Sequence, residues 1–409
     1  MLFKVASAGL AYLVNILIAK FFLIEEVGQY FLFSTWIIIF SAFSKMGLDL
    51  NSVKVIPTFL SKDDNKGLNS YVKNVKGVML INSIILGIPL TFIVYYLSKN
   101  YFIAAFSFLS LYAYATKDIY AAILRGHLEY VRSSIVLNIS IPFFSVLILI
   151  SIYFLSTNII SYTIFNISSI IALILGIYFM SNIYETNLLN PFKVEYKKAI
   201  KAINFIKYQI TLLTVMIIWL PNILISFFFE VESVAIFNIS NRTAVFISFI
   251  YIAIENYIAP KISSLYEKRE YKKIEILLIS MSKLAFLISS CLLLVFLIFS
   301  SEILLLFGEK YKDDNSFLVI MSCAQYINVI SGNAASYLLM TGREEEVRKA
   351  YIIVVLVMIT VLSIISFIFS NIFIFTIIYG IIISMYNIWL AFIVYRKYNL
   401  RVSFLQIEK

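Results

Sequence analysis

Arg242 stands inside an apolar run, FNISNRTAVFISF, that is long enough to lie within lipid. A charged side chain at such a depth costs at least ~2.5 kcal/mol in insertion measurements, so its presence there indicates a role. Asn238 and Asn241 share a helical face with Arg242, which gives the helix a polar stripe. We expect this stripe to face a solvated cavity, where Arg242, Asn238 and Asn241 bind an anionic substrate. The alternative is that Arg242 pairs with a neighbouring helix for packing alone.

Two further charges are adjacent in a second apolar segment, at Lys117 and Asp118. An intramembrane carboxylate has the chemistry to carry a coupling proton or sodium ion, so we predict that Asp118 binds the ion and Lys117 the substrate. The pair could instead neutralise itself at the membrane interface. Lys20, near the end of the first apolar segment, is a third candidate cation for the substrate, unless it snorkels to the interface. Glu255 is either a second ion-coupling group or a residue at the membrane boundary.

The composition is that of an integral membrane protein. Hydrophobic residues make up 61% of the 409 and charged residues 14%, with a mean hydropathy of +0.93, which the surface of a water-soluble domain would not tolerate. Cys291 and Cys323 both fall within apolar segments, so we expect neither a disulfide nor a metal site. His127 is the only histidine, which excludes a His-pair metal site and a Ser/His/Asp triad. No GxxxxGK[ST] loop occurs, so we expect the chain not to hydrolyse ATP by itself. We also expect a transporter without enzyme activity and without a bound cofactor.

Twelve apolar segments close to the ~20 residues needed to cross a bilayer recur along the chain. They are too long and too continuously apolar for barrel strands, which would show ~10 residues of strict alternation. We therefore predict an all-α integral membrane protein with twelve transmembrane helices, at residues 2–23, 27–48, 75–97, 101–122, 133–155, 159–182, 208–229, 233–256, 278–299, 316–340, 350–370 and 372–395.

The Lys and Arg residues predict the orientation, because basic residues in short loops resist translocation. Most of the 33 lie in the loops after the even-numbered segments and in the tail, whereas the loops after the odd-numbered segments carry Lys99, Lys310 and Lys312. Both termini are therefore predicted to be cytoplasmic. This bias and an attraction to anionic membrane lipids account for the formal charge of +10, which does not indicate nucleic acid as a partner.

The twelve segments divide into two halves that resemble each other at an offset of 207 residues, which pairs Phe21 with Phe228 and Glu25 with Glu232. Six helices return the chain to the same side of the membrane, so the halves would be parallel repeats that hold a substrate path between them. The basic stretch between the halves is predicted to form an amphipathic helix on the inner membrane surface, and the alternative is a solvated loop. We predict an N-terminal six-helix lobe at 1–182, a cytoplasmic amphipathic linker at 183–207, and a C-terminal six-helix lobe with a short cytoplasmic tail at 208–409.

Several stretches resemble the polysaccharide-exporter branch of the multidrug/oligosaccharidyl-lipid/polysaccharide (MOP) flippase superfamily. The stretch IAKFFLIEEVGQYFL is similar to its opening signature of a basic residue, an acidic pair and Gly-x-Tyr, with Lys20 in place of the usual Arg. VAIFNISNR resembles the eighth helix, ILLLFGEKYKDDNSFLVIM resembles the turn before the tenth helix, and LMTGREEEVRK completes the series. The likeness runs through nearly the entire chain.

This resemblance implies an O-antigen-type flippase of the bacterial cytoplasmic (inner) membrane, which functions in lipopolysaccharide biosynthesis. Such proteins carry undecaprenyl-pyrophosphate-linked oligosaccharide from the inner to the outer leaflet by alternating access, through a cationic cavity between two six-helix lobes. Arg242 would match a position where relatives have cationic cavity residues, and Lys20 would fill the early basic position. The implied partners are the lipid-linked oligosaccharide, membrane lipids, and a glycan polymerase and other assembly proteins, with coupling to a proton or sodium gradient.

Two other functions stay open. A cation-coupled multidrug antiporter of the sister branch would need an acid-rich cavity, whereas the deepest full charge here, on Arg242, is positive. A membrane glycan polymerase or ligase would need a reactive site on a large outer loop, and the longest outer loop, 300–315, is too short for a domain. Peptidoglycan-precursor flippases of the same superfamily typically have two more helices, which argues against that assignment.

We expect Arg242→Ala to reduce surface glycan in a cell that depends on this protein, because the substrate phosphates would lose their buried cationic partner. Arg242→Lys keeps the charge and should retain more glycan. The measurement is the surface glycan at matched protein levels, and a normal amount with the alanine variant would contradict the proposed role.

Overall fold

A computed structural model describes residues 2–155, 160–184 and 204–406, and every regular element in those ranges is a helix. Two compact units form, Met1–Val215 and Met216–Lys409. The boundary falls within one helix, α10, somewhat later than the predicted start of the second lobe at 208. Most of the predicted linker, 183–207, lies outside the described residues, so its amphipathic helix stays a prediction.

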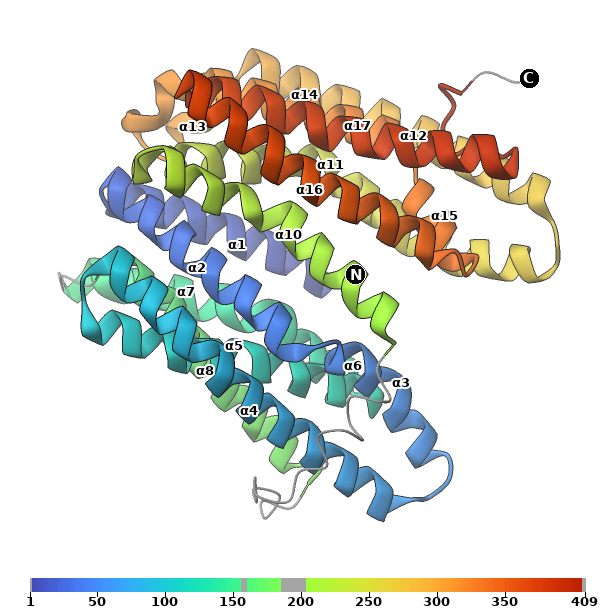
Figure 1. The fold of residues 1–409 in the computed structure, drawn as a ribbon, viewed down its shortest axis with the longest axis horizontal. Helices are drawn as coiled ribbons and strands as arrows, with labels where there is room; N and C mark the ends of the chain where they lie inside the picture. Colours follow the sequence, from blue (N-terminus) through green and yellow to red (C-terminus); the bar gives the residue numbers. More distant parts are fainter. Residues whose placement is uncertain (1, 156–159, 185–203, 407–409) are drawn as a thin grey trace. The chain divides into compact units, whose positions relative to one another are not determined.

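The first unit contains α1 to α8 and the beginning of α10 (Figure 1). Its elements are α1 (Leu2–Phe21), α2 (Ile24–Lys45), α3 (Leu48–Leu60), α4 (Asn65–Ser98), α5 (Tyr101–Gly126), α6 (Tyr130–Ser134), the π-helix η1 (Ile135–Ile139), α7 (Ser140–Leu155), α8 (Ser161–Ser181) and α10 (Phe205–Phe228), which continues into the second unit. The second unit goes on with α11 (Val231–Glu267), α12 (Tyr271–Ile298), α13 (Ser300–Leu305), the 3₁₀ turn η3 (Glu309–Asp314), α14 (Asn315–Ile330), α15 (Ala334–Met340), α16 (Glu344–Phe369) and α17 (Ile372–Tyr398).

Each of the twelve predicted segments coincides with helix in the structure, although they do not all qualify equally as membrane spans. Among the described residues, nine helices are long and apolar enough to cross a membrane, or ten if the bent pair α14 and α15 is one span. The first segment is a shorter apolar helix, Val5–Phe21. The fourth, α5, does not pass the same test, and it is the helix that carries Lys117 and Asp118.

Helix α5 is the centre of the first unit, where it packs against α2, α3, α4 and α8. Figure 1 shows α4, α5 and α8 running side by side. Small side chains such as Ser110, Ala113 and Ala115 are buried along α5. Helices in lipid associate through close packing rather than through expulsion of water, and small residues permit that closeness. The hydrophobic core around α5 includes Val75, Met79, Ile119, Ile123 and Leu173.

The break between the first two helices recurs in the second half of the chain, at the same offset of 207 residues that aligns the two halves of the sequence. Helix α1 ends at Phe21 and α10 ends at Phe228, while α2 begins at Ile24 and α11 begins at Val231. Both differences equal 207 (228 − 21 and 231 − 24), the offset that aligns Glu25 with Glu232. The paired sequence motifs therefore mark the same structural feature, a helix break of the same length.

The C-terminal segment after α17 closes over the break between α14 and α15, where the two helices bend by 43°. Ser403 Oγ donates to the carbonyl of Ile330 at 2.6 Å, and the Phe404 amide donates to Ser282 Oγ at 3.0 Å. Gly332, with φ of +85°, lies at the break. A Cβ on Gly332 would stand 2.2 Å from the carbonyl oxygen of Val402. The tail can pack this closely only because residue 332 has no side chain.

We expect Gly332→Ala to lower the stability of the purified protein by at least ~2 kcal/mol, because it adds left-handed backbone strain and a clash with main chain. Gly342→Ala is the matched control, since Gly342 also has a positive φ, +75°, but a Cβ added there would have no neighbouring atom within 4 Å. Thermal unfolding in detergent measures both. Equal losses for the two variants would show that the tail does not hold the break.

Candidate functional site

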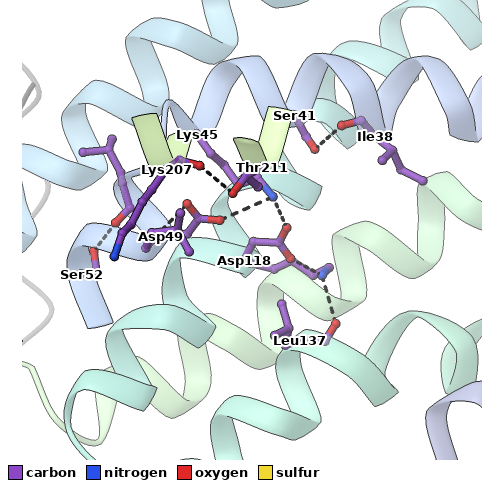
Figure 2. Close-up of polar contacts among 12 residues, drawn as sticks. Ile38, Ser41, Lys45, Asp49, Ser52, Asp118, Leu137, Lys207 and Thr211 are labelled. Carbon is purple, nitrogen blue, oxygen red and sulfur yellow. Dashed lines mark hydrogen bonds and ion pairs between the residues drawn. The ribbon is translucent and has the colours of Figure 1, made fainter. Parts of the chain in front are cut away.

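A cluster of charged side chains is buried at the centre of the first unit, around Asp118 on α5. Lys45 Nζ donates to Asp118 Oδ2 at 2.6 Å, and Lys117 Nζ donates to Asp118 Oδ1 at 2.6 Å. Each carboxylate oxygen therefore accepts from a different ammonium group. Asp49 lies at the edge of the cluster, 3.9 Å from Lys45 Nζ. Figure 2 shows Lys45, Asp49 and Asp118 converging on one point.

A tight turn directly after Lys45 brings Asp49 back toward it. Lys45 is the last residue of α2, and Met46 and Gly47 both adopt left-handed backbone conformations, with φ of 47° and 77°. Helix α3 then begins at Leu48, which puts Asp49 one turn after Lys45. Glycine is the residue that adopts this conformation without strain, so the stretch Ser44 to Asp49 suits such a turn.

The π-helix η1 and Tyr114 of α5 supply the remaining contacts of Lys117. The Lys117 ammonium lies 3.4 Å from the carbonyl oxygen of Leu137, and 4.6 Å from the centre of the Tyr114 ring. Ser7 Oγ donates to the next carbonyl, that of Asn138, at 2.6 Å. In a π-helix the hydrogen bonds run from residue i to i+5, which perturbs the regular ladder and turns carbonyls toward outside partners. Such segments are frequent at functional sites.

Burial differs between the two lysines. Lys117 is 2% exposed and Asp118 8%, whereas the side chain of Lys45 is 14% exposed. Each ammonium has three N–H donors, and Asp118 takes one from each lysine. Lys45 is therefore the more exposed cation of the cluster, and Asp118 holds it in place.

Arg242 lies on α11 in the second unit, half-buried, with its guanidinium carbon 5.1 Å from the centre of the Trp219 ring. A guanidinium over an indole face at this distance gains cation–π stabilisation. The contact ties the Arg242 side chain to α10, the helix that carries Trp219. Its role in binding substrate stays a prediction.

The two asparagines predicted to join Arg242 have partners within the protein. Asn238 and Asn222 of α10 exchange amide hydrogen bonds at 2.9 and 3.2 Å, and Asn238 also donates to the carbonyl of Val234. This reciprocal amide pair holds α10 and α11 together. The side chain of Asn241 hydrogen-bonds to Tyr379 of α17, and its Oδ1 atom is buried with no hydrogen-bond partner among the described residues. Asn241 thus keeps an acceptor that no described residue satisfies, and its role in substrate binding stays a prediction.

Glu255, also on α11, accepts a hydrogen bond from Ser336 Oγ at 2.6 Å. The hydroxyls of Tyr251, Tyr351 and Tyr386 lie within electrostatic range of its carboxylate. In the described part of the chain no Lys or Arg pairs with Glu255. The site is therefore acidic and aromatic, in contrast to the lysine-rich cluster of the first unit.

Lys20 is exposed in the last turn of α1 and forms no ion pair with a described residue. Sequence reasoning missed Lys45 and Asp49 as site residues, because Lys45 counted only as a basic residue of an inner loop. The spacing of four residues between Lys45 and Asp49, across a Met-Gly pair, was the available signal. Nothing in the sequence indicated that the end of α2 would place Lys45 against Asp118 of α5.

We predict that Lys117→Met destabilises the protein by roughly 3–5 kcal/mol, because it leaves a buried carboxylate with one partner fewer. The double variant Lys117→Met/Asp118→Leu removes both charges and should lose less than the sum of the two single variants. Lys45→Met, at the more exposed side of Asp118, should lose less than Lys117→Met. Chemical or thermal unfolding in detergent measures the stability of each variant. If the double variant loses the sum of the two single losses, Lys117 and Asp118 are not energetically coupled.

No protein-family model matches the chain, and a comparison of its sequence with curated proteins finds no match. Solved structures do match. An inward-facing multidrug resistance MATE family transporter of the MOP superfamily has a TM-score of 0.71 at 16% identity, covering 96% of this chain and 93% of that one. The lipid II flippase MurJ, in an inward closed conformation, has a TM-score of 0.74 at 15% identity, covering 95% and 87%. The outward-facing MATE conformation matches with a TM-score of 0.59 at 16% identity, covering 97% and 94%. Over nearly its full length, therefore, this membrane protein has the fold of the transporters and flippases of the MOP superfamily.

Proposed function

We propose that the chain is a flippase that moves undecaprenyl-pyrophosphate-linked oligosaccharide, an O-antigen or similar repeat unit, from the inner to the outer leaflet of a bacterial cytoplasmic membrane. The fold supports a transporter, since similar structures include a lipid II flippase and multidrug transporters. The sequence motifs from Ile18 to Leu32 and from Leu339 to Lys349 favour the polysaccharide-exporting branch. A glycan polymerase and other assembly proteins would act on the product.

The observation that carries the proposal is the pair of ammonium groups on Asp118. Lys45 and Lys117 share the carboxylate of Asp118, with Lys117 almost fully buried, and the second acid of the cluster, Asp49, makes only a longer contact of 3.9 Å with Lys45 Nζ. Buried cations are expensive in a membrane protein unless an anion pairs with them during function. A pyrophosphate group carries the charge and the acceptor oxygens that Lys45 and Lys117 can bind.

The second unit contributes Arg242, whose guanidinium stacks on Trp219. Arg presents several donors in a plane, which suits a phosphate group, and an aromatic ring beneath it fixes that plane. Asn241 and Lys20 would serve the sugar hydroxyls or the phosphates at other stages of the cycle. The polyprenyl chain can stay in lipid while the charged head group moves, so the protein need only shield the head group.

Net outward flow requires either removal of the product or coupling to an ion gradient. Both oxygens of Asp118 are already taken by ammonium groups at 2.6 Å, so a cation would have to displace a lysine there. Glu255 has a hydroxyl partner, Ser336, and no basic partner among the described residues. We therefore assign the coupling of a proton or sodium ion to Glu255 in preference to Asp118.

A second candidate is a cation-coupled multidrug antiporter. Glu255 and its neighbours Tyr251, Tyr351 and Tyr386 favour it, because a carboxylate among aromatic rings suits an organic cation. The lysine cluster argues against it, since Lys45, Lys117 and Arg242 would repel a cationic drug. The two functions therefore predict opposite substrate charges.

Proteoliposomes that contain the full chain can test both functions. We expect outward movement of a polyprenyl-pyrophosphate oligosaccharide, read as new access of an added glycosidase to the sugar, and no accumulation of a cationic dye under a proton or sodium gradient. Lys45→Gln should slow lipid movement about tenfold, as expected for loss of one charge-assisted contact. Lys45→Arg should retain most of the rate.

Lys310→Gln, at an exposed lysine in η3 of the second unit, removes the same charge away from the cluster and should leave the rate unchanged. Dye accumulation without movement of the lipid would overturn the flippase assignment in favour of the antiporter. Equal rates for Lys45→Gln and Lys310→Gln would remove the lysine cluster from the mechanism.

A further inference from the structure

A groove of about 490 Å³ opens on the second unit between helices α11 and α12, close to the turn that joins them. It belongs to neither of the charged sites described above. Its lining combines basic, hydroxyl and aliphatic side chains: Lys261, Ser264, Leu265, Lys273, Ile276, Leu277 and Ser280.

The polar lining comes equally from the two helices. Lys261 of α11 donates to the hydroxyl of Tyr257 and lies 4.0 Å from the centre of that ring, which holds its ammonium in place. Lys273 of α12 pairs with Glu270 at 3.0 Å, yet its side chain stays 66% exposed. Ser264 and Ser280 add one hydroxyl from each helix. Two ammonium groups flanked by hydroxyls match the charge and the acceptors of a phosphodiester.

The apolar part of the groove continues along the surface of α12. Ile276 is 64% exposed in the groove, and Leu287 and Leu294, at 62% and 58%, follow it on the same helical face. Helix α12 is among those long and apolar enough to cross a membrane. This face therefore meets lipid acyl chains, and it leads directly from the hydrocarbon region to the two lysines.

A third lysine lies on this lipid-facing stripe. Lys283 is exposed, stands seven residues after Ile276, and so projects from the same face of α12. It makes no ion pair with any described residue. A lysine in that position extends its side chain toward the nearest polar region, which here is the end of the helix where the groove opens.

We propose that this groove binds an anionic phospholipid, with the phosphate between Lys261 and Lys273 and an acyl chain along Ile276, Leu287 and Leu294. Basic pockets between helices at a membrane surface bind acidic lipid head groups in this way. The exposed aliphatic side chains of Ile276, Leu287 and Leu294 distinguish a lipid from a free phosphate ion, which would use the lysines but leave these side chains unused. The inference does not depend on the transported substrate.

The test is lipid binding by the purified full chain in detergent, titrated with phosphatidylglycerol and followed by native mass spectrometry. We expect Lys261→Gln/Lys273→Gln to weaken binding about tenfold, because two charges near the phosphate are lost. The matched control is Lys268→Gln/Lys272→Gln, which removes the same charge from the same helical hairpin outside the groove. Its affinity should stay within about twofold of the unaltered chain.

Two further titrations test whether the molecule bound in the groove is an anionic phospholipid. Phosphatidylcholine, which carries no net charge, should bind more weakly than phosphatidylglycerol, and inorganic phosphate at millimolar concentration should not displace the lipid. Equal affinities for the groove variant and the control variant would overturn the site. Displacement of phosphatidylglycerol by inorganic phosphate would overturn the assignment to a lipid. Because all four substituted lysines are exposed, loss of folding is not expected in either variant.

Discussion

The carboxylate of Asp118 is the contact on which the first unit depends. It joins Lys45 at the end of α2 to Lys117 on α5, and Lys117 in turn reaches the backbone of η1. Without this carboxylate Lys117 would keep no acidic partner among the described residues, and Lys45 would keep only Asp49 at 3.9 Å. Asp118 fixes the positions of both bases, and Asp49, 3.9 Å from Lys45 Nζ, is the second acid of the cluster.

Much of the fold could be predicted from the sequence, because long apolar segments leave little choice in a bilayer except helices. All twelve predicted segments are helical, and the helix break before α2 recurs before α11 at the predicted offset. The limits of each helix were less predictable. Helix α4 extends well before the predicted segment 75–97, and α11 runs beyond 233–256, because hydropathy marks the lipid-facing part of a helix and not its polar ends.

The site was only partly predictable. Lys117 and Asp118 could be found because a charge in an apolar helix is conspicuous, whereas their partner Lys45 resembles any inner-loop lysine until the packing of α2 against α5 is known. On α11 the sequence pattern suggested a substrate-binding residue that the structure shows paired with another helix. Asn238 shares a helical face with Arg242, yet its amide joins Asn222 of another helix, and helical spacing alone carries no information about such partners.

The π-helix at Ile135–Ile139 gives the first unit a property that its α-helices lack. It contains more residues in a turn than the helices on either side, so shortening it by one residue would restore a regular α-helix and rotate α6 by about 100° relative to α7. The carbonyl of Leu137 would then turn away from Lys117.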